Sequence, residues 1–404
     1  MPNAAAPLLV FADDWGRHPS SCQHLVGQLL PRRSVTWVNT VGTRPPRFNL
    51  ATVRRGWEKA KQWVRPPAAK EPADQASPLV LNPRMWPWMA SRFDRALNRR
   101  LLVRQLGPLL RGLPAPPVAV TTLPIVADLV GGLPVARWVY YCVDDFGRWP
   151  GLDGPALRRL EEQLVRGMDT IVAVSEALRD RLAGMCDAPV QLLTHGVDPE
   201  FWSDESAEAI PALSGLERPL IAFWGLIDRR MDLGFVKRLS ADLAHGTIVL
   251  AGPHDQPDPA LLRLPRVASI GQLSFDQLPR LGREAAVLVM PYADLPVTRA
   301  IQPLKLKEYL ATGRPVVARD LPAVREWADA LDVADNPEAF STAVRRRLAT
   351  GLPADQRAAR GRLAAESWQA KAREFERILG EPERQRGMGP SVGLGLGNEA
   401  VAVP

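Results

Sequence analysis

The 404-residue chain contains little of what crosslinks a protein or binds a metal: it has five histidines and three cysteines, Cys22, Cys142 and Cys186. Because the cysteines are widely spaced and odd in number, they form neither a disulfide framework nor a metal-ligand pattern, and we expect a reducing cytoplasm. The sequence has no HExxH, CxxC or GxSxG motif, so zinc hydrolysis and serine-esterase chemistry have no support. It also lacks a Walker-type phosphate loop and the Rossmann glycine fingerprint.

Long apolar runs are absent as well. No run approaches the roughly 20 residues that span a bilayer, and no basic segment precedes the first apolar run, so we expect neither a membrane span nor a signal peptide. Hydrophobic residues make up 46% of the chain and charged residues 24%, which is typical of a globular protein. A chain of this length exceeds one compact core and fits two domains of roughly 200 residues each.

The net charge of +7 is concentrated in one region. Residues 44–111 hold 15 basic and 4 acidic residues, whereas the rest of the chain holds 36 basic and 40 acidic residues. Four tryptophans are interleaved with these cations: Trp57, Trp63, Trp86 and Trp88. This combination favours an anionic membrane surface as a partner. A solvated enzyme face is the main alternative, and nucleic acid, although chemically compatible, is not expected.

Apolar runs alternate with amphipathic helical patterns, which indicates an α/β fold with parallel sheets. The expected strands are residues 7–12, 34–40, 118–123, 138–143 and 170–174, then 220–224, 247–251, 267–270, 287–291 and 315–318. Helical stripes are expected at residues 157–166 and along Trp368, Ala372, Phe375 and Leu379.

The acidic, weakly periodic stretch at 196–216 precedes a fresh β-α series. We therefore predict an N-terminal domain at 1–200 and a C-terminal domain at 201–380, both doubly wound. In such sheets, ligands lie beyond the carboxyl ends of the strands. The tail at 381–404 is rich in glycine and small residues, and we expect it to be disordered.

Residues 301–317, IQPLKLKEYLATGRPVV, predict a short helix that feeds a buried strand. Pro303 suits the first helical position, and Gly313 suits the left-handed position that ends a helix. Lys305 and Glu308 are three residues apart and share one helix face. A cation for phosphate at a helix N-terminus, beside a carboxylate for ribose hydroxyls, indicates a nucleotide site. Pro303 and Leu304 belong to the same candidate site, and an ordinary surface helix is the alternative.

Two further segments of the second half are candidates for phosphate binding. Gly225 ends a strand, where a ligand can approach the backbone, and Arg229 and Arg230 follow it. Two arginines there would clamp a diphosphate in a bidentate manner. Thr298 and Arg299 lie in the loop that leads to Pro303, and we expect them near the phosphates if the helix is there.

In the first half, Asp144 and Asp145 directly follow a buried strand. A carboxylate at this end of the sheet is a candidate general base toward a sugar hydroxyl, although helix capping is an equal alternative. Gly16 and His18 follow the first strand and are candidates for the acceptor site. His195, which follows the last strand of the first domain, is a third candidate for the acceptor site, and there we favour a structural role over catalysis.

Taken together, these segments resemble one known family. The sequences FWG at 223–225, PY at 291–292, PLK at 303–305 and EYLATGRPVV at 308–317, with DTIVAVSEAL at 169–178 and HGVD at 195–198, are similar to GT-B glycosyltransferases. The nearest branch is glycosyltransferase family 4 and its bacterial teichuronic-acid-type relatives. The resemblance covers roughly residues 7–380 and implies two Rossmann-like domains that face a cleft. It places a nucleotide-sugar donor in the C-terminal domain and an acceptor in the N-terminal domain.

The resemblance also assigns roles and exposes departures. Glu308 matches the ribose-binding glutamate of the family, and Lys305 matches a lysine that some branches place against the phosphates. The second glutamate, usually eight residues earlier, is replaced by Ala300, and Leu226 stands where the family has a basic residue after the glycine. The diphosphate clamp is therefore expected from Arg229, Arg230, Arg299 or Lys305.

These observations predict a glycosyltransferase that moves a sugar from a nucleoside diphosphate to a glycan or a lipid-linked acceptor in cell-envelope polysaccharide synthesis. We expect no metal and no cofactor other than the donor, with retention of configuration implied by the resemblance alone. Asp144 or Asp145 would position or deprotonate the acceptor. A nucleotide-sugar epimerase with the GT-B fold and a non-catalytic membrane- or glycan-binding scaffold remain as alternatives. The expected place is the cytoplasm or the inner face of the plasma membrane.

Overall fold

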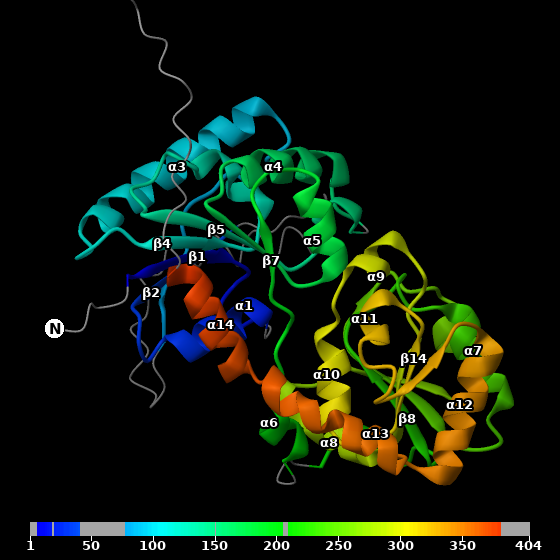
Figure 1. Cartoon of the computed structure of the whole chain (residues 1–404). Helices are drawn as coiled ribbons and strands as arrows, with labels where there is room; N and C mark the ends of the chain where they lie inside the picture. The colour runs from blue at the N-terminus through cyan, green and yellow to red at the C-terminus, as the bar shows by residue number, and fades with distance from the viewer. Residues whose placement is uncertain (1–5, 18–19, 41–76, 150, 205–208, 381–404) are drawn as a thin grey trace, which may run out of the picture.

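The computed structural model describes residues 6–17, 20–40, 77–149, 151–204 and 209–380. His18, the basic stretch at 44–76 and the tail at 381–404 lie outside the described residues. The described chain forms two parallel sheets, each with its own buried core, in two lobes (Figure 1).

The first sheet has seven parallel strands in the order β3-β2-β1-β4-β5-β6-β7. Strand β1, the third in this order, is buried at every position, as expected of a strand that helices cover on both faces. Val10 of β1 pairs with Trp37 on one side and with Val120 on the other. The strands are β1 (Leu8–Ala12), β2 (Val35–Asn39), β3 (Leu79–Leu81), β4 (Val118–Thr121), β5 (Arg137–Cys142), β6 (Thr170–Ala173) and β7 (Val190–Leu192).

Helices pack on both sides of this sheet, and polar side chains cap their N-termini. Ser91 and Asp94 form a capping box at the start of α3, and Asp153 caps α4. The long helices of the first lobe are α1 (Ser21–Leu29), α3 (Arg92–Arg111), α4 (Gly154–Arg166) and α5 (Glu176–Ala183).

The second sheet has six parallel strands in the order β12-β10-β8-β13-β14-β15. They are β8 (Leu220–Trp224), β10 (Thr247–Ala251), β12 (Val267–Gly271), β13 (Ala285–Met290), β14 (Val316–Arg319) and β15 (Asp332–Ala334), with a small pair β9 (Ile227–Asp228) and β11 (His254–Asp255) beside them. The helices are α6 (Pro199–Ser203), α7 (Leu233–Asp242), α8 (Leu278–Glu284), α9 (Pro296–Ala300), α10 (Leu304–Ala311), α11 (Pro322–Arg325), α12 (Pro337–Thr350), α13 (Ala354–Ala359) and α14 (Trp368–Gly380).

The ten predicted strands are all confirmed, with ends that shift by one or two residues. Five short strands were not predicted, namely β3, β7 and β15 and the pair β9 and β11, because two or three residues are too few for a periodic pattern. Among the described helices, none combines the length and the apolarity that crossing a bilayer requires.

The chain crosses between the two lobes twice, and the crossings touch each other. Val197 in the first crossing forms a parallel bridge with Ser367 in the second. Beyond this point α14 lies against α1 on the first lobe (Figure 1), where Phe375 and Ile378 are fully buried in its core. The domain boundaries stay a prediction, but the last helix of the predicted C-terminal domain packs on the first sheet.

Candidate functional site

Two glycines, Gly225 and Gly252, follow the carboxyl ends of β8 and β10, where their backbones approach each other closely. Gly225 has a φ of +130° and Gly252 a φ of +152°, which side chains rarely adopt. A Cβ added to Gly252 would lie 1.9 Å from the carbonyl oxygen of Gly225. The two backbones are therefore in contact, and only glycine fits there.

Gly252→Ala is expected to lower the free energy of unfolding by about 2 to 4 kcal/mol, since the new methyl group would force the two strand ends apart in addition to straining φ. Urea unfolding measures this directly. Gly271→Ala is the matched control, because Gly271 also has a positive φ (+76°) but has no atom within 4 Å of an added Cβ. Equal losses in the two variants would show that the contact with Gly225 does not matter.

Lys305 brings a cation to Gly225 from the first turn of α10. Its ammonium donates to the hydroxyl of Tyr292 at 2.6 Å and would lie 2.5 Å from a Cβ on Gly225. Within the described residues it has no carboxylate partner. Pro303 is the N-cap of the helix, one position before the predicted place, and Leu304 is the first helical residue. The free N–H groups of the first turn and the ammonium together favour an anion above Gly225.

Glu308 lies one turn further along the same side of α10. Its Oε2 accepts a hydrogen bond from the indole N–H of Trp224 at 3.2 Å. Burial raises the pKa of Glu308 to about 7, while the Trp224 bond and the charge of Lys305 act in the opposite direction. Trp224 is held in turn by Tyr309, whose hydroxyl accepts from its backbone N–H at 3.0 Å. A carboxylate with one free oxygen beside an unpaired ammonium fits the ribose and phosphates of a nucleotide.

Thr298 and Arg299, two predicted site residues that precede α10, each have a partner within their own segment. The Thr298 hydroxyl is buried and donates to the backbone of Ala293, which shapes the turn into α9. Arg299 forms an ion pair with Asp294 at 2.5 Å, and its side chain is 64% exposed. A predicted phosphate role for these two residues stays a prediction, and each already has a partner.

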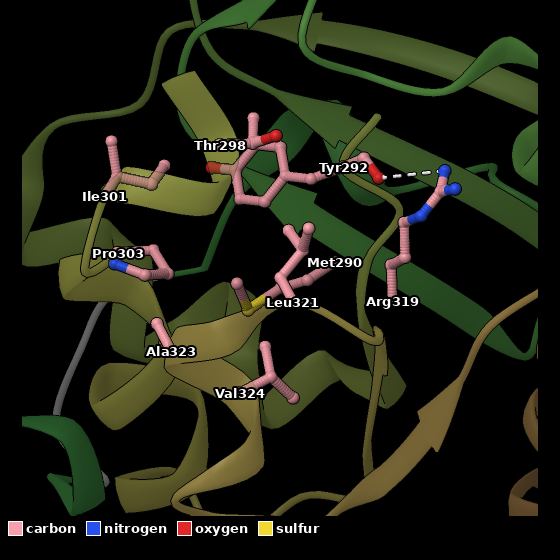
Figure 2. A pocket seen from close by; sticks show the side chains of 9 residues that line it. All are labelled: Met290, Tyr292, Thr298, Ile301, Pro303, Arg319, Leu321, Ala323 and Val324. Atoms are coloured by element: carbon pink, nitrogen blue, oxygen red, sulfur yellow. Dashed lines mark hydrogen bonds between the residues drawn. The ribbon is translucent and has the colours of Figure 1, made fainter. Parts of the chain in front are cut away.

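Figure 2 shows the small apolar niche behind this segment, lined by Met290, Ile301, Pro303, Leu321 and Val324 among others. Its charged member, Arg319, donates to Asp232 at 2.6 Å. It also donates to the carbonyl of Tyr292 at 3.5 Å, the bond drawn as a dashed line in Figure 2. The niche therefore fixes the backbone that carries Tyr292, the hydrogen-bond acceptor of Lys305.

The two arginines after Gly225 differ in what they offer a diphosphate. Arg230 is buried, and its Nε lies 3.0 and 2.9 Å from the two carboxylate oxygens of Asp228. Its guanidinium also lies 4.6 Å from the ring centre of Trp149, a residue of the first lobe. Arg229 donates to Gln256 at 3.4 Å. Arg230 therefore bridges the two lobes, and Asp228 already balances its charge.

In the first lobe, Asp144 and Asp145 follow β5 as predicted, but their surroundings differ. Asp145 is 2% exposed, with Arg148 at 3.5 Å and Arg181 at 3.6 Å from its Oδ2. Burial raises the pKa of Asp144 to about 7, against the lowering effect of Arg230. Because a general base works best with a pKa near the operating pH, Asp144 suits this role better than the ion-paired Asp145.

The remaining predicted acceptor residues are spread over two places. The Gly16 amide donates to Gln23 at 3.0 Å, with φ at +75°, so this glycine forms a turn after β1. His195 lies at the first crossing, 5% exposed, and its amide donates to Gln302 at 2.7 Å. Burial and the charge of Lys307 lower the pKa of His195 to about 3. These contacts agree with the structural role that we favoured for His195.

Sequence reasoning missed Lys307, which shares α10 with the nucleotide candidates but faces the other way. Its ammonium donates to the carbonyl of His195 at 2.6 Å and pairs with Glu366. It thus connects α10 to both crossings between the lobes. A buried lysine two residues from Lys305 leaves no distinct signal in a single sequence.

Within the described residues, no group of three or more His, Cys, Asp or Glu side chains is arranged to hold a metal ion. Ala300 occupies the position of the second family glutamate. It is 7% exposed, and its carbonyl accepts from the Ser175 hydroxyl at 2.6 Å. This position therefore contributes a contact between the lobes.

The second lobe, which carries Lys305 and Glu308, matches a known protein family. Residues 218–350 match the family model described as glycosyl transferases group 1. The match lies within the second lobe and includes α10. The chain is also 29% identical over 175 residues to the putative teichuronic acid biosynthesis glycosyltransferase TuaH of Bacillus subtilis (strain 168). That match covers 41% of this chain and 44% of the length of the relative.

Solved structures place the whole chain in the GT-B fold. An alpha,alpha-trehalose-phosphate synthase (UDP-forming) from Burkholderia vietnamiensis aligns with a TM-score of 0.66 at 14% identity, over 94% of this chain and 99% of that one. A sucrose-phosphate synthase from Thermosynechococcus elongatus gives 0.65 at 17% identity, over 92% and 98%. Anabaena Alr3699/HepE in complex with UDP-glucose gives 0.60 at 12% identity, over 93% and 99%. At these identities the likeness establishes the fold alone.

Proposed function

We propose that this protein is a glycosyltransferase that moves a sugar from a nucleoside diphosphate to a glycan or lipid-linked acceptor. The observation that carries the proposal is the unpaired Lys305 ammonium above Gly225, beside the Glu308 carboxylate on the same helix. The group 1 domain spans this helix, and a relative named for teichuronic acid biosynthesis supports a role in cell-envelope polysaccharide synthesis. Such an enzyme would work in the cytoplasm, and a lipid-linked acceptor would bring it to the inner face of the plasma membrane.

In the proposed mechanism, the donor sugar gains oxocarbenium character while charge builds on the leaving diphosphate. Lys305 and the free N–H groups at the start of α10 would stabilise that charge, so that transfer proceeds without a metal or a further cofactor. Glu308 would hold the ribose, and Asp144 would position or deprotonate the acceptor hydroxyl. Retention of configuration is part of the proposal and rests on the family resemblance.

One observation favours a second candidate. Because Ala300 replaces the second glutamate of the family and forms a contact between the lobes instead, a GT-B scaffold that binds nucleotide without transferring sugar is the main rival. A nucleotide-sugar epimerase is the other. Epimerisation or hydrolysis of the donor in the absence of an acceptor would identify the epimerase, whereas nucleotide binding without any turnover would identify the scaffold.

The first test is a thermal-shift panel of UDP, GDP, ADP and dTDP on the wild-type protein. We expect one of these nucleotides to raise the Tm clearly above the others, which would also name the base. Inorganic phosphate and the matching nucleoside are the controls, because each fills only half of the site. The absence of a shift with all four nucleotides would contradict the donor site.

A further inference from the structure

The outer side of α3 and the segment before it form a basic and aromatic patch, which we call the α3 surface. It comprises Trp86, Trp88, Arg92, Phe93, Arg100 and Arg104. Residues 77–111 contain seven arginines, no lysine and a single acidic residue, Asp94. In Figure 1, α3 lies on the first lobe, on the side away from α10, the helix that carries Lys305.

Two of the seven arginines already have partners. Arg95 donates to both carboxylate oxygens of Asp128, at 2.7 and 2.6 Å, and Arg99 donates to the carbonyl of the same residue at 3.0 Å. These bonds fasten α3 to the first lobe. On this side of the helix, Asp128 therefore occupies the hydrogen-bond donors of both arginines.

The arginines on the outer side behave differently. Arg92, Arg100 and Arg104 are exposed, and in the described part of the chain they have neither an ion pair nor a hydrogen bond. Arg100 lies seven residues after Phe93, and Arg104 lies eleven residues after it. Phe93, Arg100 and Arg104 therefore share one face of the helix. A row of free guanidinium groups on one face is complementary to an anionic surface.

The aromatic residues gather at the N-terminal end of this face. Phe93 is 72% exposed, and Trp86 and Trp88 are each 38% exposed. The centroids of the two indole rings lie 4.8 Å apart. The indole N–H of Trp86 donates to the carboxylate of Asp94, a member of the capping box, at 2.8 Å. Trp86 is therefore held against the first turn of α3, and the large apolar ring of Phe93 is left in water.

We propose that the α3 surface docks on an anionic lipid bilayer. Tryptophans with one apolar and one polar edge settle at the headgroup level, and arginines reach the lipid phosphates from beside them. The exposed Phe93 ring favours a bilayer, because it gains by leaving water for the acyl boundary. Since an aromatic ring can also stack on an unpaired base, binding to RNA is the alternative outcome of the test. The inference goes beyond the proposed function, since it requires neither a bound donor nor sugar transfer.

The test is sedimentation of the full chain with vesicles of phosphatidylcholine alone or mixed with an equal part of phosphatidylglycerol. We expect binding to the mixed vesicles only, and we expect added salt to weaken it. The combined variant Arg92→Gln, Arg100→Gln, Arg104→Gln should bind about tenfold more weakly or worse. Phe93→Ser should also weaken binding, but with an unchanged salt dependence.

The matched control carries the same loss of charge elsewhere: Arg263→Gln, Arg357→Gln and Arg373→Gln, all exposed. Equal binding by the α3 variant and this control would overturn the proposal, as would wild-type protein that ignores mixed vesicles. Loss of binding to a short RNA by the α3 variant, with no vesicle binding at all, would reassign the surface to nucleic acid. The thermal shift caused by a nucleotide should be the same in all these variants. The nucleotide test of the proposed donor site is therefore independent of the vesicle test.

Discussion

Lys305→Ala is expected to weaken nucleoside-diphosphate binding by about 10- to 100-fold, which corresponds to the loss of one or two charge-assisted hydrogen bonds to phosphate. The physical reason is that Lys305 is a cation without a carboxylate partner in the described chain, held by Tyr292 next to the Gly225 backbone. Isothermal titration with the nucleotide that gives a thermal shift measures the loss. Sugar transfer should fall further still, because charge on the diphosphate grows in the transition state.

The control for this prediction is Lys237→Ala, which removes an exposed lysine from α7. Its nucleotide affinity should equal that of the wild type. The parent nucleoside, which lacks phosphate, should bind Lys305→Ala and the wild type alike. Lys305→Arg is expected to restore little, because the larger planar group has to fit where the ammonium already approaches Gly225. Unchanged diphosphate affinity in Lys305→Ala would remove this residue from the donor site.

The strands could be predicted because a parallel sheet covered on both sides needs continuous apolar runs, and such runs are visible in a sequence. The partner of the last helix could not be predicted in the same way. The stripe of Trp368, Ala372 and Phe375 correctly indicated an amphipathic helix, but it does not say which core receives it. The packing of α14 against α1, with Phe375 buried in the first core, shows that the chain has returned to the first lobe.

Some residues of the candidate site could likewise be predicted from the sequence, and others could not. Lys305, Glu308 and Gly225 could be predicted to meet because helix periodicity and strand ends fix their positions locally. Arg230 and Arg299 were chosen for their charge, and the structure gives each a nearby carboxylate, Asp228 and Asp294. A cation in a sequence does not reveal whether it already has a partner, so these two were the weaker candidates.

The helix α10 also joins two regions that the sequence treats as separate. Lys305 and Glu308 face the strand ends of the second lobe, while Lys307 contacts His195 and Glu366 at the two crossings. Gln302, just before the helix, accepts from the His195 amide. A nucleotide that shifts α10 would therefore act directly on the segments that connect the lobes.

Glu308→Gln is expected to change nucleotide binding in a way that depends on pH. Because burial raises the pKa of Glu308 to about 7, the carboxylate that accepts ribose hydroxyls forms only as the pH rises through neutrality. Wild-type affinity should increase from pH 6 to pH 8, whereas Glu308→Gln should show no such increase and should bind about tenfold more weakly at pH 8. In Trp224→Phe, which lacks the N–H donor to Glu308, the midpoint of this rise in affinity should lie at a higher pH than in the wild type.

The same variant should affect stability in the opposite direction. In the folded protein the pKa of Glu308 lies above its unfolded value of about 4.3, so the folded state retains a proton that the unfolded chain releases. The resulting stabilisation is complete below about pH 4.3 and is lost as the pH rises through 7. Glu308→Gln has no such loss and should exceed the wild type by about 1 to 3 kcal/mol at pH 8. Urea unfolding at pH 5 and pH 8 measures this, and a constant difference between the two proteins would show that Glu308 is not desolvated in the free enzyme.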